Sequence, residues 1–231
     1  MSTEKKQEVY HEGSKVYDAA GAAMMTFTPI NHIHQHLSAF HVYAQDRTRP
    51  VEAHHFCGRR SKDFHQCVVY DSDAPDARLI GIEYIVSEQI FNSLPEEEQK
   101  YWHSHKYEVE SGVLCLETKG IVPSVMNDTA EQPAMLELHQ TYGKAIHTWA
   151  FDEFPELPLG PPQLMMSYTG DNQANDELIR RRDERSKVSS SAKRKLREGY
   201  LPPYEKHNKA DQWEKSDTGV TFKGEEVQIQ K

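Results

Sequence analysis

Two histidines, a tryptophan, a tyrosine and two glutamates fall within nine consecutive residues, 102–110. His103 and His105 are two positions apart, and side chains with that spacing face the same side of an extended backbone. Both imidazoles can therefore reach one ion, and zinc, iron and manganese accept imidazole and carboxylate ligands. This stretch is the first candidate for a metal site, and its other members are candidates for the surrounding pocket: Trp102, Tyr107, Glu108 and Glu110.

A further candidate ligand, Glu83, stands within an apolar run at 79–86. The run has apolar residues at both odd and even positions, which is typical of a strand buried on both faces. A buried carboxylate needs a partner, because taking its charge out of water costs several kcal/mol. The sequence leaves three solutions open, namely protonation, a metal ion, or a salt bridge with Arg59, Arg60 or Arg78.

Histidines upstream of this run could complete the site. We expect residues 51–86 to form strands, and a hairpin folded symmetrically about Ala74 would place one of these histidines opposite Glu83. The three segments would then meet in one pocket, where an ion with an open coordination position could activate water. The candidate metal ligands are His103, His105, Glu83, His55 and His65.

A partial resemblance points to one class of metal enzyme. His103, His105 and Glu110 follow the spacing His-x-His-x4-Glu, which resembles the first metal motif of the cupin barrels. Residues 158–163 are loosely similar to the second cupin motif, with Gln163 at the position of its third histidine. The resemblance implies a cupin-like, metal-dependent enzyme as one hypothesis.

The histidines near the N-terminus fall in a predicted helix. Thr28 and Pro29 form a helix start, and apolar residues at helical spacing after them predict a helix over 29–41. His32 and His36 are four apart and could share an ion, but they lie away from the apolar stripe. We interpret the histidines of this helix as a solvated face or as hydrogen-bonded edge residues.

Two more helices are expected beside the strands. A capping box at 93–96 predicts a helix over 94–102. Apolar residues at helical spacing after Pro133, stopped by Gly143, predict a helix over 130–142. Further strands are expected at 113–116, 146–151 and 163–168. The fold class predicted is α+β, a single domain with a central, mostly antiparallel sheet flanked by helices.

Composition limits the function classes. The 231 residues carry a net charge of −9, which argues against general nucleic-acid binding. The sequence has no P-loop, no dinucleotide-binding GxGxxG and no GxSxG motif. Three cysteines without a CxxC pair predict reduced, inert thiols in a cytoplasmic protein. No secretory signal and no apolar run of about 20 residues occurs, so we expect a soluble protein. A homo-oligomer remains open.

The ends of the chain differ from its middle. We expect a mobile arm over 1–23, one domain over 24–198 and a polar, largely disordered tail over 199–231. Charged helices are predicted at 175–187 and 190–197. Between 179 and 197 there are nine Lys/Arg and two Asp/Glu residues, and such a block is either solvated or suited to anionic lipid headgroups. The candidates for a lipid surface are Arg180, Arg181, Arg182, Lys193, Arg194, Lys195 and Arg197.

A dense set of motifs resembles the oil body-associated protein family. In chain order the motifs are HHFC at 54–57, DFHQC at 63–67, YDSD at 70–73, LIGIEYIVS at 79–87, WHSH at 102–105, YEV at 107–109, TYGK at 141–144 and LPLGPPQLMMS at 157–167. The likeness covers about residues 25–187. It implies peripheral association with lipid droplets or oil bodies as the leading hypothesis. It implies no established reaction and transfers no catalytic residue.

Overall fold

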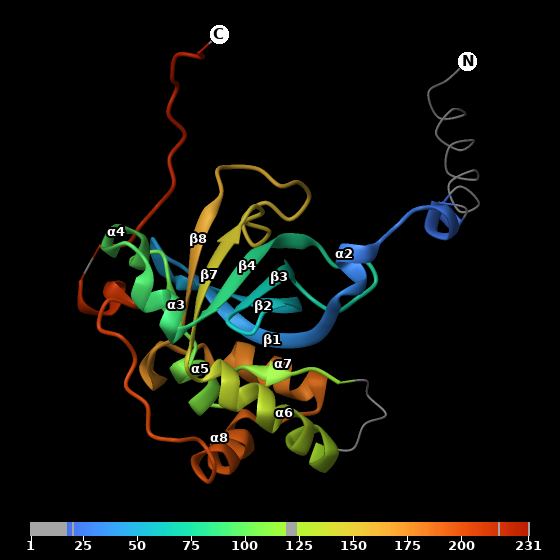
Figure 1. Cartoon of the computed structure of the whole chain (residues 1–231), viewed down its shortest axis with the longest axis vertical. Helices are drawn as coiled ribbons and strands as arrows, with labels where there is room; N and C mark the ends of the chain where they lie inside the picture. The colour runs from blue at the N-terminus through green and yellow to red at the C-terminus, as the bar shows by residue number, and fades with distance from the viewer. Residues whose placement is uncertain (1–17, 20, 119–123, 217, 231) are drawn as a thin grey trace. The chain divides into compact units, whose positions relative to one another are not determined.

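The computed structural model describes residues 18–19, 21–118, 124–216 and 218–230. The chain divides into two units, residues 1–33 and residues 34–231. The described part of the first unit contains the short helix α2 (Thr28–Asn31), with proline in its first turn. The second unit contains the sheet and the remaining helices (Figure 1).

An antiparallel sheet forms the centre of the second unit. The strands run in the order β2-β3-β4-β7-β8-β1, and β1 also pairs with β2, so the sheet closes on itself. The prediction of a mostly antiparallel sheet in an α+β fold is confirmed, but the sheet is closed and barrel-like rather than simply flanked by helices. The strands are β1 (Ile33–Tyr43), β2 (Asp46–Ser61), β3 (Phe64–Tyr70), β4 (Leu79–Ser87), β5 (His103–Ser104), β6 (Cys115–Leu116), β7 (Thr141–His147) and β8 (Gln163–Ser167).

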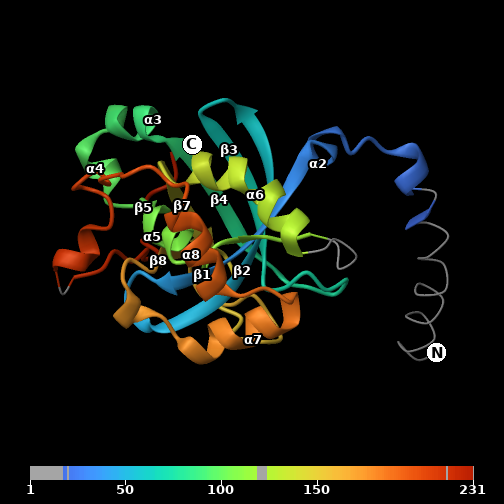
Figure 2. The same cartoon turned by 90° about the horizontal axis from the view of Figure 1, so that it is seen from below.

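Helices cover this sheet unevenly. Helices α5 to α8 gather below the strands in Figure 1 and lie in front of them in Figure 2, while α3 and α4 lie at another edge. Among the described residues, every helix is too short or too polar to cross a membrane. The helices are α3 (Glu88–Ser93), α4 (Glu96–Gln99), α5 (Lys106–Glu110), α6 (Ser124–Leu138), α7 (Asp176–Ser186) and α8 (Ser190–Glu198). The two predicted charged helices near the C-terminus are thus confirmed as α7 and α8.

The predicted helix over 29–41 is wrong, because most of this segment is strand β1. Leu37 and Ala39 pack into one core cluster, whereas Phe40 and Val42 pack into another. Alternate residues therefore face opposite sides, and apolar partners cover both. A strand buried on both faces has apolar residues at every spacing, including the helical one.

The other two predicted helices are displaced along the chain. The helix predicted over 94–102 is present only as the short α4 at 96–99, and the expected cap Ser93 instead donates to the Ile90 carbonyl at the end of a separate helix, α3, which Ser87 caps. Helix α6 ends at 138 and carries Pro133 inside it. Gly143 does not end a helix but lies in β7, which takes the place of the strand expected at 146–151. The pairing of β7 with β4 and β8 overrides the local helix signals.

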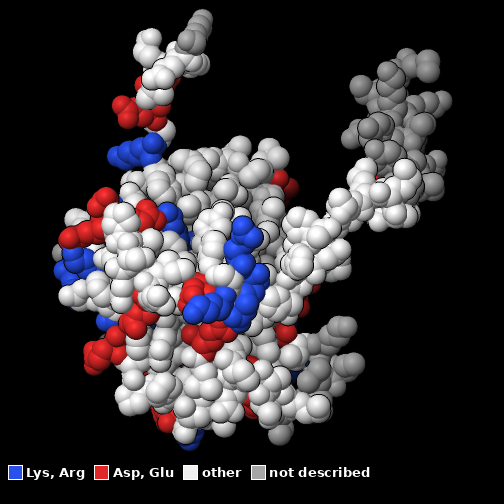
Figure 3. Space-filling view, in the orientation of Figure 1, with Lys and Arg blue, Asp and Glu red and all other residues white. Residues whose placement is uncertain are grey.

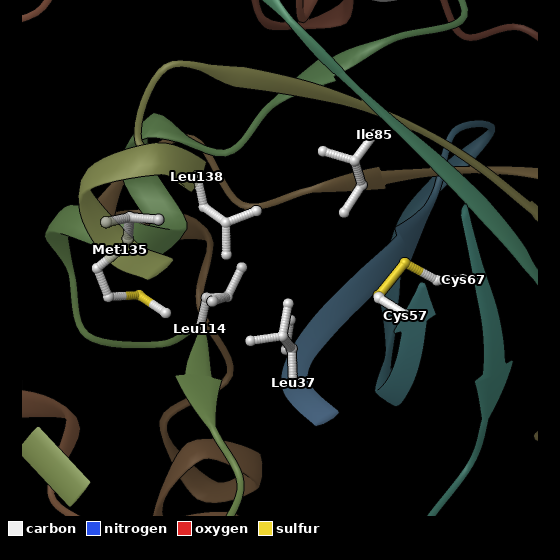
Figure 4. Close-up of a cluster of buried hydrophobic side chains, with 9 residues drawn as sticks. Leu37, Cys57, Cys67, Ile85, Leu114, Met135 and Leu138 are labelled. Atoms are coloured by element: carbon white, nitrogen blue, oxygen red, sulfur yellow. A yellow bond between two sulfur atoms is a disulfide. The ribbon is translucent and has the colours of Figure 1, made fainter. Parts of the chain in front are cut away.

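Two of the three cysteines are joined. Cys57 and Cys67 lie directly opposite each other on β2 and β3 and form a disulfide, with a Cα–Cα distance of 4.1 Å. The bond lies in an apolar cluster beside Leu37 and Ile85 (Figure 4). The prediction of reduced thiols is therefore wrong for this pair. Cys115 is a free, buried thiol.

A histidine of β1 should make stability depend on pH. Burial, and then the neighbouring His54, lower the pKa of His36 to about 4. The unfolded chain takes up a proton near pH 6.5 that the folded protein resists until about pH 4, so stability falls as the pH decreases through this window. We expect His36→Gln to reduce the loss between pH 6.5 and pH 4 by about 1–2 kcal/mol, allowing for partial solvent exposure. Urea unfolding at both pH values measures it, and equal losses in the two proteins would refute it.

Candidate metal centre

The closed sheet brings buried histidines and glutamates together on its inner face. Five strands contribute, together with helix α5 and the residue that precedes it, because alternate residues of each strand point inward. Every member of the set is buried. We call it the histidine–glutamate centre, and its members are His41, His55, Glu83, His103, His105, Glu108 and His147.

Glu83 lies in the middle of this centre, with a different pair of imidazoles at each carboxylate oxygen. Its Oε2 lies 2.7 Å from Nε2 of His55 and 3.6 Å from Nε2 of His41. Its Oε1 lies 3.2 Å from Nε2 of both His103 and His105. Burial alone would raise the pKa of Glu83, but these imidazoles hold it well below its usual value. The carboxylate is therefore an anion enclosed by four imidazole nitrogens.

The arginine partners considered for Glu83 lie elsewhere. Arg59 pairs with Glu137, and Arg78 pairs with Asp71. Arg60 is exposed. The hypothesis of an arginine salt bridge is therefore wrong, and histidines take that place.

A glycine leaves the room that this arrangement needs. A Cβ atom at Gly143 would lie 2.0 Å from Oε1 of Glu83 and 2.6 Å from Nε2 of His103. Gly81, on the adjacent strand, allows the close approach of β7, because a Cβ there would lie 2.3 Å from the Ile146 carbonyl oxygen and 3.0 Å from Cδ2 of the His147 ring. Side chains at either position would displace the centre.

Hydrogen bonds fix the tautomer of one imidazole. The Thr141 hydroxyl donates its only proton to the Leu138 carbonyl, at 2.7 Å. Its oxygen must then accept from Nδ1–H of His105, at 2.8 Å. Nε2 of His105 is thus directed at the Glu83 carboxylate, and in the neutral imidazole it carries a lone pair. Two acceptors facing each other at 3.2 Å require a second proton or a cation between them.

Several polar groups of the centre lack partners among the described residues. Both ring nitrogens of His103 and one carboxylate oxygen of Glu108 are buried and make no hydrogen bond. Burial raises the pKa of Glu108 to about 7, because together with the nearby charge of Glu83 it outweighs the opposing effects of His105 and Ser167. Such groups are costly in an apolar interior and are suited to hold a cation.

Donor distances fit metal coordination. His41, Glu83 and His103 offer ligand atoms that all lie within 4.8 Å of one another, and so do His103, His105 and Glu108. Nitrogen and oxygen ligands lie about 2.0–2.2 Å from zinc, so two ligands of one ion can be up to about 4 Å apart. The residues present therefore fit a divalent ion after small adjustments.

Two of the predicted ligands, His103 and His105, do meet Glu83, and His55 meets it as well. His65 does not, because the β3–β4 register places it opposite Ile85 and puts Cys67 opposite Glu83. The hairpin is therefore not symmetric about Ala74, and His65 binds Glu137 instead.

The predicted pocket residues divide in the same way. Glu108 belongs to the centre, whereas Trp102, Tyr107 and Glu110 bind other groups. Trp102 donates to Glu98, Tyr107 donates to Asp171, and Glu110 binds Lys106 and His139. The sequence prediction missed His41 and His147. No local signal marks them, because their inward direction follows from the pairing of β1 with β8 and of β7 with β4.

The seven lipid-surface candidates separate into buried and exposed side chains. Arg182, Lys193 and Arg197 are buried. The guanidinium groups of Arg182 and Arg197 donate to backbone carbonyls of residues 109–114, and Lys193 pairs with Glu131. The other four candidates reach the surface: Arg180, Arg181, Arg194 and Lys195. The three arginines among them form ion pairs.

Comparisons with known proteins give one consistent result. Residues 27–200 match the family model "Protein of unknown function (DUF1264)". The chain is 43% identical over 190 residues to Oil body-associated protein 1B of Arabidopsis thaliana, covering 82% of this chain and 76% of that protein. It is 43% identical over 203 residues to Oil body-associated protein 2A of Zea mays, covering 87% and 78%. No solved structure matches it.

Proposed function

The chain belongs to the DUF1264 family of oil body-associated proteins, and we propose that it is a metal-binding member whose histidine–glutamate centre holds a divalent ion of zinc, iron or manganese. The observation that carries this proposal is the contact between His105 and Glu83. Nδ1 of His105 carries the ring proton and donates it to Thr141, so the other ring nitrogen, Nε2, faces Oε1 of Glu83 at 3.2 Å with its lone pair.

The chemistry of the donor set supports a metal over a purely structural cluster. Glu83 is a buried anion, and the side chains within reach of it are imidazoles rather than Lys or Arg, among the residues that the structure describes. Imidazole and carboxylate are the ligands that zinc, iron and manganese share. Thr141 and His147 bind the outer nitrogens of His105 and His41, as partners of metal-bound histidines commonly do.

Metal binding should be measurable as stabilisation. We expect protein purified without an affinity tag to retain at least one equivalent of metal. Thermal unfolding should show the metal-free protein gaining about 2.7 kcal/mol of stability at an ion concentration 100 times the dissociation constant. Elemental analysis and calorimetry with Zn²⁺, Mn²⁺ and Fe²⁺ test this. Less than a tenth of an equivalent, with no shift by any of the three ions, would overturn the proposal.

The names of the relatives favour a second function, peripheral association with oil bodies. They are called oil body-associated proteins. On the face drawn in Figure 3, acidic and basic side chains lie side by side, and no large uniformly basic area is seen. Three of the seven lipid-surface candidates are buried, so a lipid contact through these candidates would rest on the other four. Exposed Leu196 lies next to one of them, Lys195.

Charge reversal tests this association without removing α7 and α8. We expect the double variant Arg181→Glu, Lys195→Glu to bind anionic lipid droplets at least about 10-fold less, because each cation near such a surface contributes about 1 kcal/mol. Flotation with droplets containing phosphatidylserine measures it. Lys62→Glu, an exposed charge on the β2–β3 turn, is the matched control. Equal flotation of the double variant and the wild type would exclude contact through this block.

A further inference from the structure

The two oxygens of Glu83 face separate donor sets. On the Oε2 side, Nε2 of His41 and Nε2 of His55 are 3.1 Å apart, and both point at that oxygen. On the Oε1 side, His103 and His105 each approach within 3.2 Å. Each oxygen of the carboxylate therefore faces its own pair of imidazoles, and ligand atoms of His41 and His103 lie within 4.8 Å of each other across it.

Each pair has an additional element that completes it. Glu108 lies with His103 and His105 in one group of ligand atoms within 4.8 Å of one another. An outer hydrogen bond orients one imidazole in each pair: Nδ1 of His41 is hydrogen-bonded to Nε2 of His147 on one side, and Nδ1–H of His105 donates to Thr141 on the other. Each half thus offers a carboxylate oxygen and two imidazoles, one of which is oriented by an outer hydrogen bond.

We infer that the centre binds two divalent ions bridged by the carboxylate of Glu83, an inference that rests on the proposed metal binding. One ion is held by His41, His55 and Oε2 of Glu83. The other ion is held by the remaining oxygen of Glu83 with His103, His105 and Glu108.

The number and kind of donors support two ions. Four imidazoles and two carboxylates provide more ligand atoms than the four that zinc takes, and at least as many as the six of an octahedral ion. Two imidazoles and one carboxylate form the set that non-haem iron uses while keeping open positions. In two-metal sites the ions are about 3.5–4 Å apart, a separation that a bridging carboxylate can span, and they bind a small oxygen ligand between them.

Metal counting tests the inference directly. We expect the tag-free protein, saturated with Mn²⁺ or Zn²⁺ and freed of excess ion, to contain two equivalents. His55→Ala should remove one ion and Glu108→Gln the other, each leaving one equivalent, because the two changes lie in different halves. His65→Ala is the matched control and should retain two, since its side chain binds Glu137 outside the centre.

A spectroscopic measurement needs no variant. Two Mn²⁺ ions bridged by a carboxylate should give an exchange-coupled electron paramagnetic resonance spectrum, whereas a single Mn²⁺ gives six lines. One equivalent with a six-line spectrum would overturn the two-ion inference and leave the proposed metal binding intact. No bound metal at all would overturn the proposed function itself.

Discussion

Replacing Glu83 by glutamine is expected to lower the affinity for a divalent ion by more than about 100-fold. Changes to groups that only orient a metal ligand typically cost 10–100-fold, and Glu83 contacts all four central imidazoles. Glutamine keeps the volume of the side chain but removes the charge and one acceptor oxygen. Competition titration of Zn²⁺ against a chromophoric chelator measures the change.

The control for this variant carries the same substitution outside the centre. Glu137 pairs with His65 and Arg59 outside the histidine–glutamate centre, so Glu137→Gln should leave the Zn²⁺ affinity within about twofold of the wild type. If Glu83→Gln binds Zn²⁺ as tightly as Glu137→Gln, the carboxylate of Glu83 is not a ligand. Circular dichroism of both variants separates a loss of ligand from a loss of fold.

Part of the centre could be predicted from sequence because local spacing carries the information. His103 and His105 are two residues apart, and Glu83 is a carboxylate within an apolar strand, so each residue is conspicuous on its own. The structure departs in detail, because only His103 is in a strand while His105 is the N-cap of α5. Both side chains still reach the same carboxylate.

The rest of the centre depends on closure of the sheet. His41 lies on β1, and its inward direction follows from pairing with β8, more than 120 residues later in the chain. A helical pattern in residues 29–41 concealed that strand, and no local signal announces a pairing between segments so far apart. His147 lies in a segment that was expected to be a strand, but its place beside His41 depends on the pairing of β7 with β4 and β8, which the local pattern does not give.

The burial of three cations of the basic block could also not be predicted from the sequence. Arginines usually lie on the surface, and nothing in residues 175–198 distinguishes Arg182 and Arg197 from their exposed neighbours by composition. They are distinguished by position, because their faces of α7 and α8 meet the carbonyl groups of residues 109–114. The block therefore attaches helices to the sheet as well as carrying charge at the surface.

Replacing Arg197 by alanine is expected to destabilise the protein by about 3–5 kcal/mol, the cost of removing one member of a buried ion pair. Its guanidinium binds Glu131 at 2.9 Å and donates to the carbonyls of Val109 and Leu114, at 2.6 and 2.9 Å. Without it, the Val109 and Leu114 carbonyls each lose a guanidinium donor, and among the described residues Glu131 keeps Lys193 as its cationic partner. Equilibrium unfolding in urea measures the difference.

Lys195 on the same helix provides the comparison, because it is exposed and lies two residues away. Lys195→Ala should change the free energy of unfolding by no more than about 0.5 kcal/mol, as is usual for surface substitutions. The pair separates the two roles of the basic block, since Arg197 should matter for folding and Lys195 for binding to anionic droplets. A cost below about 1 kcal/mol for Arg197→Ala would mean that the stability of the fold does not depend on this buried contact.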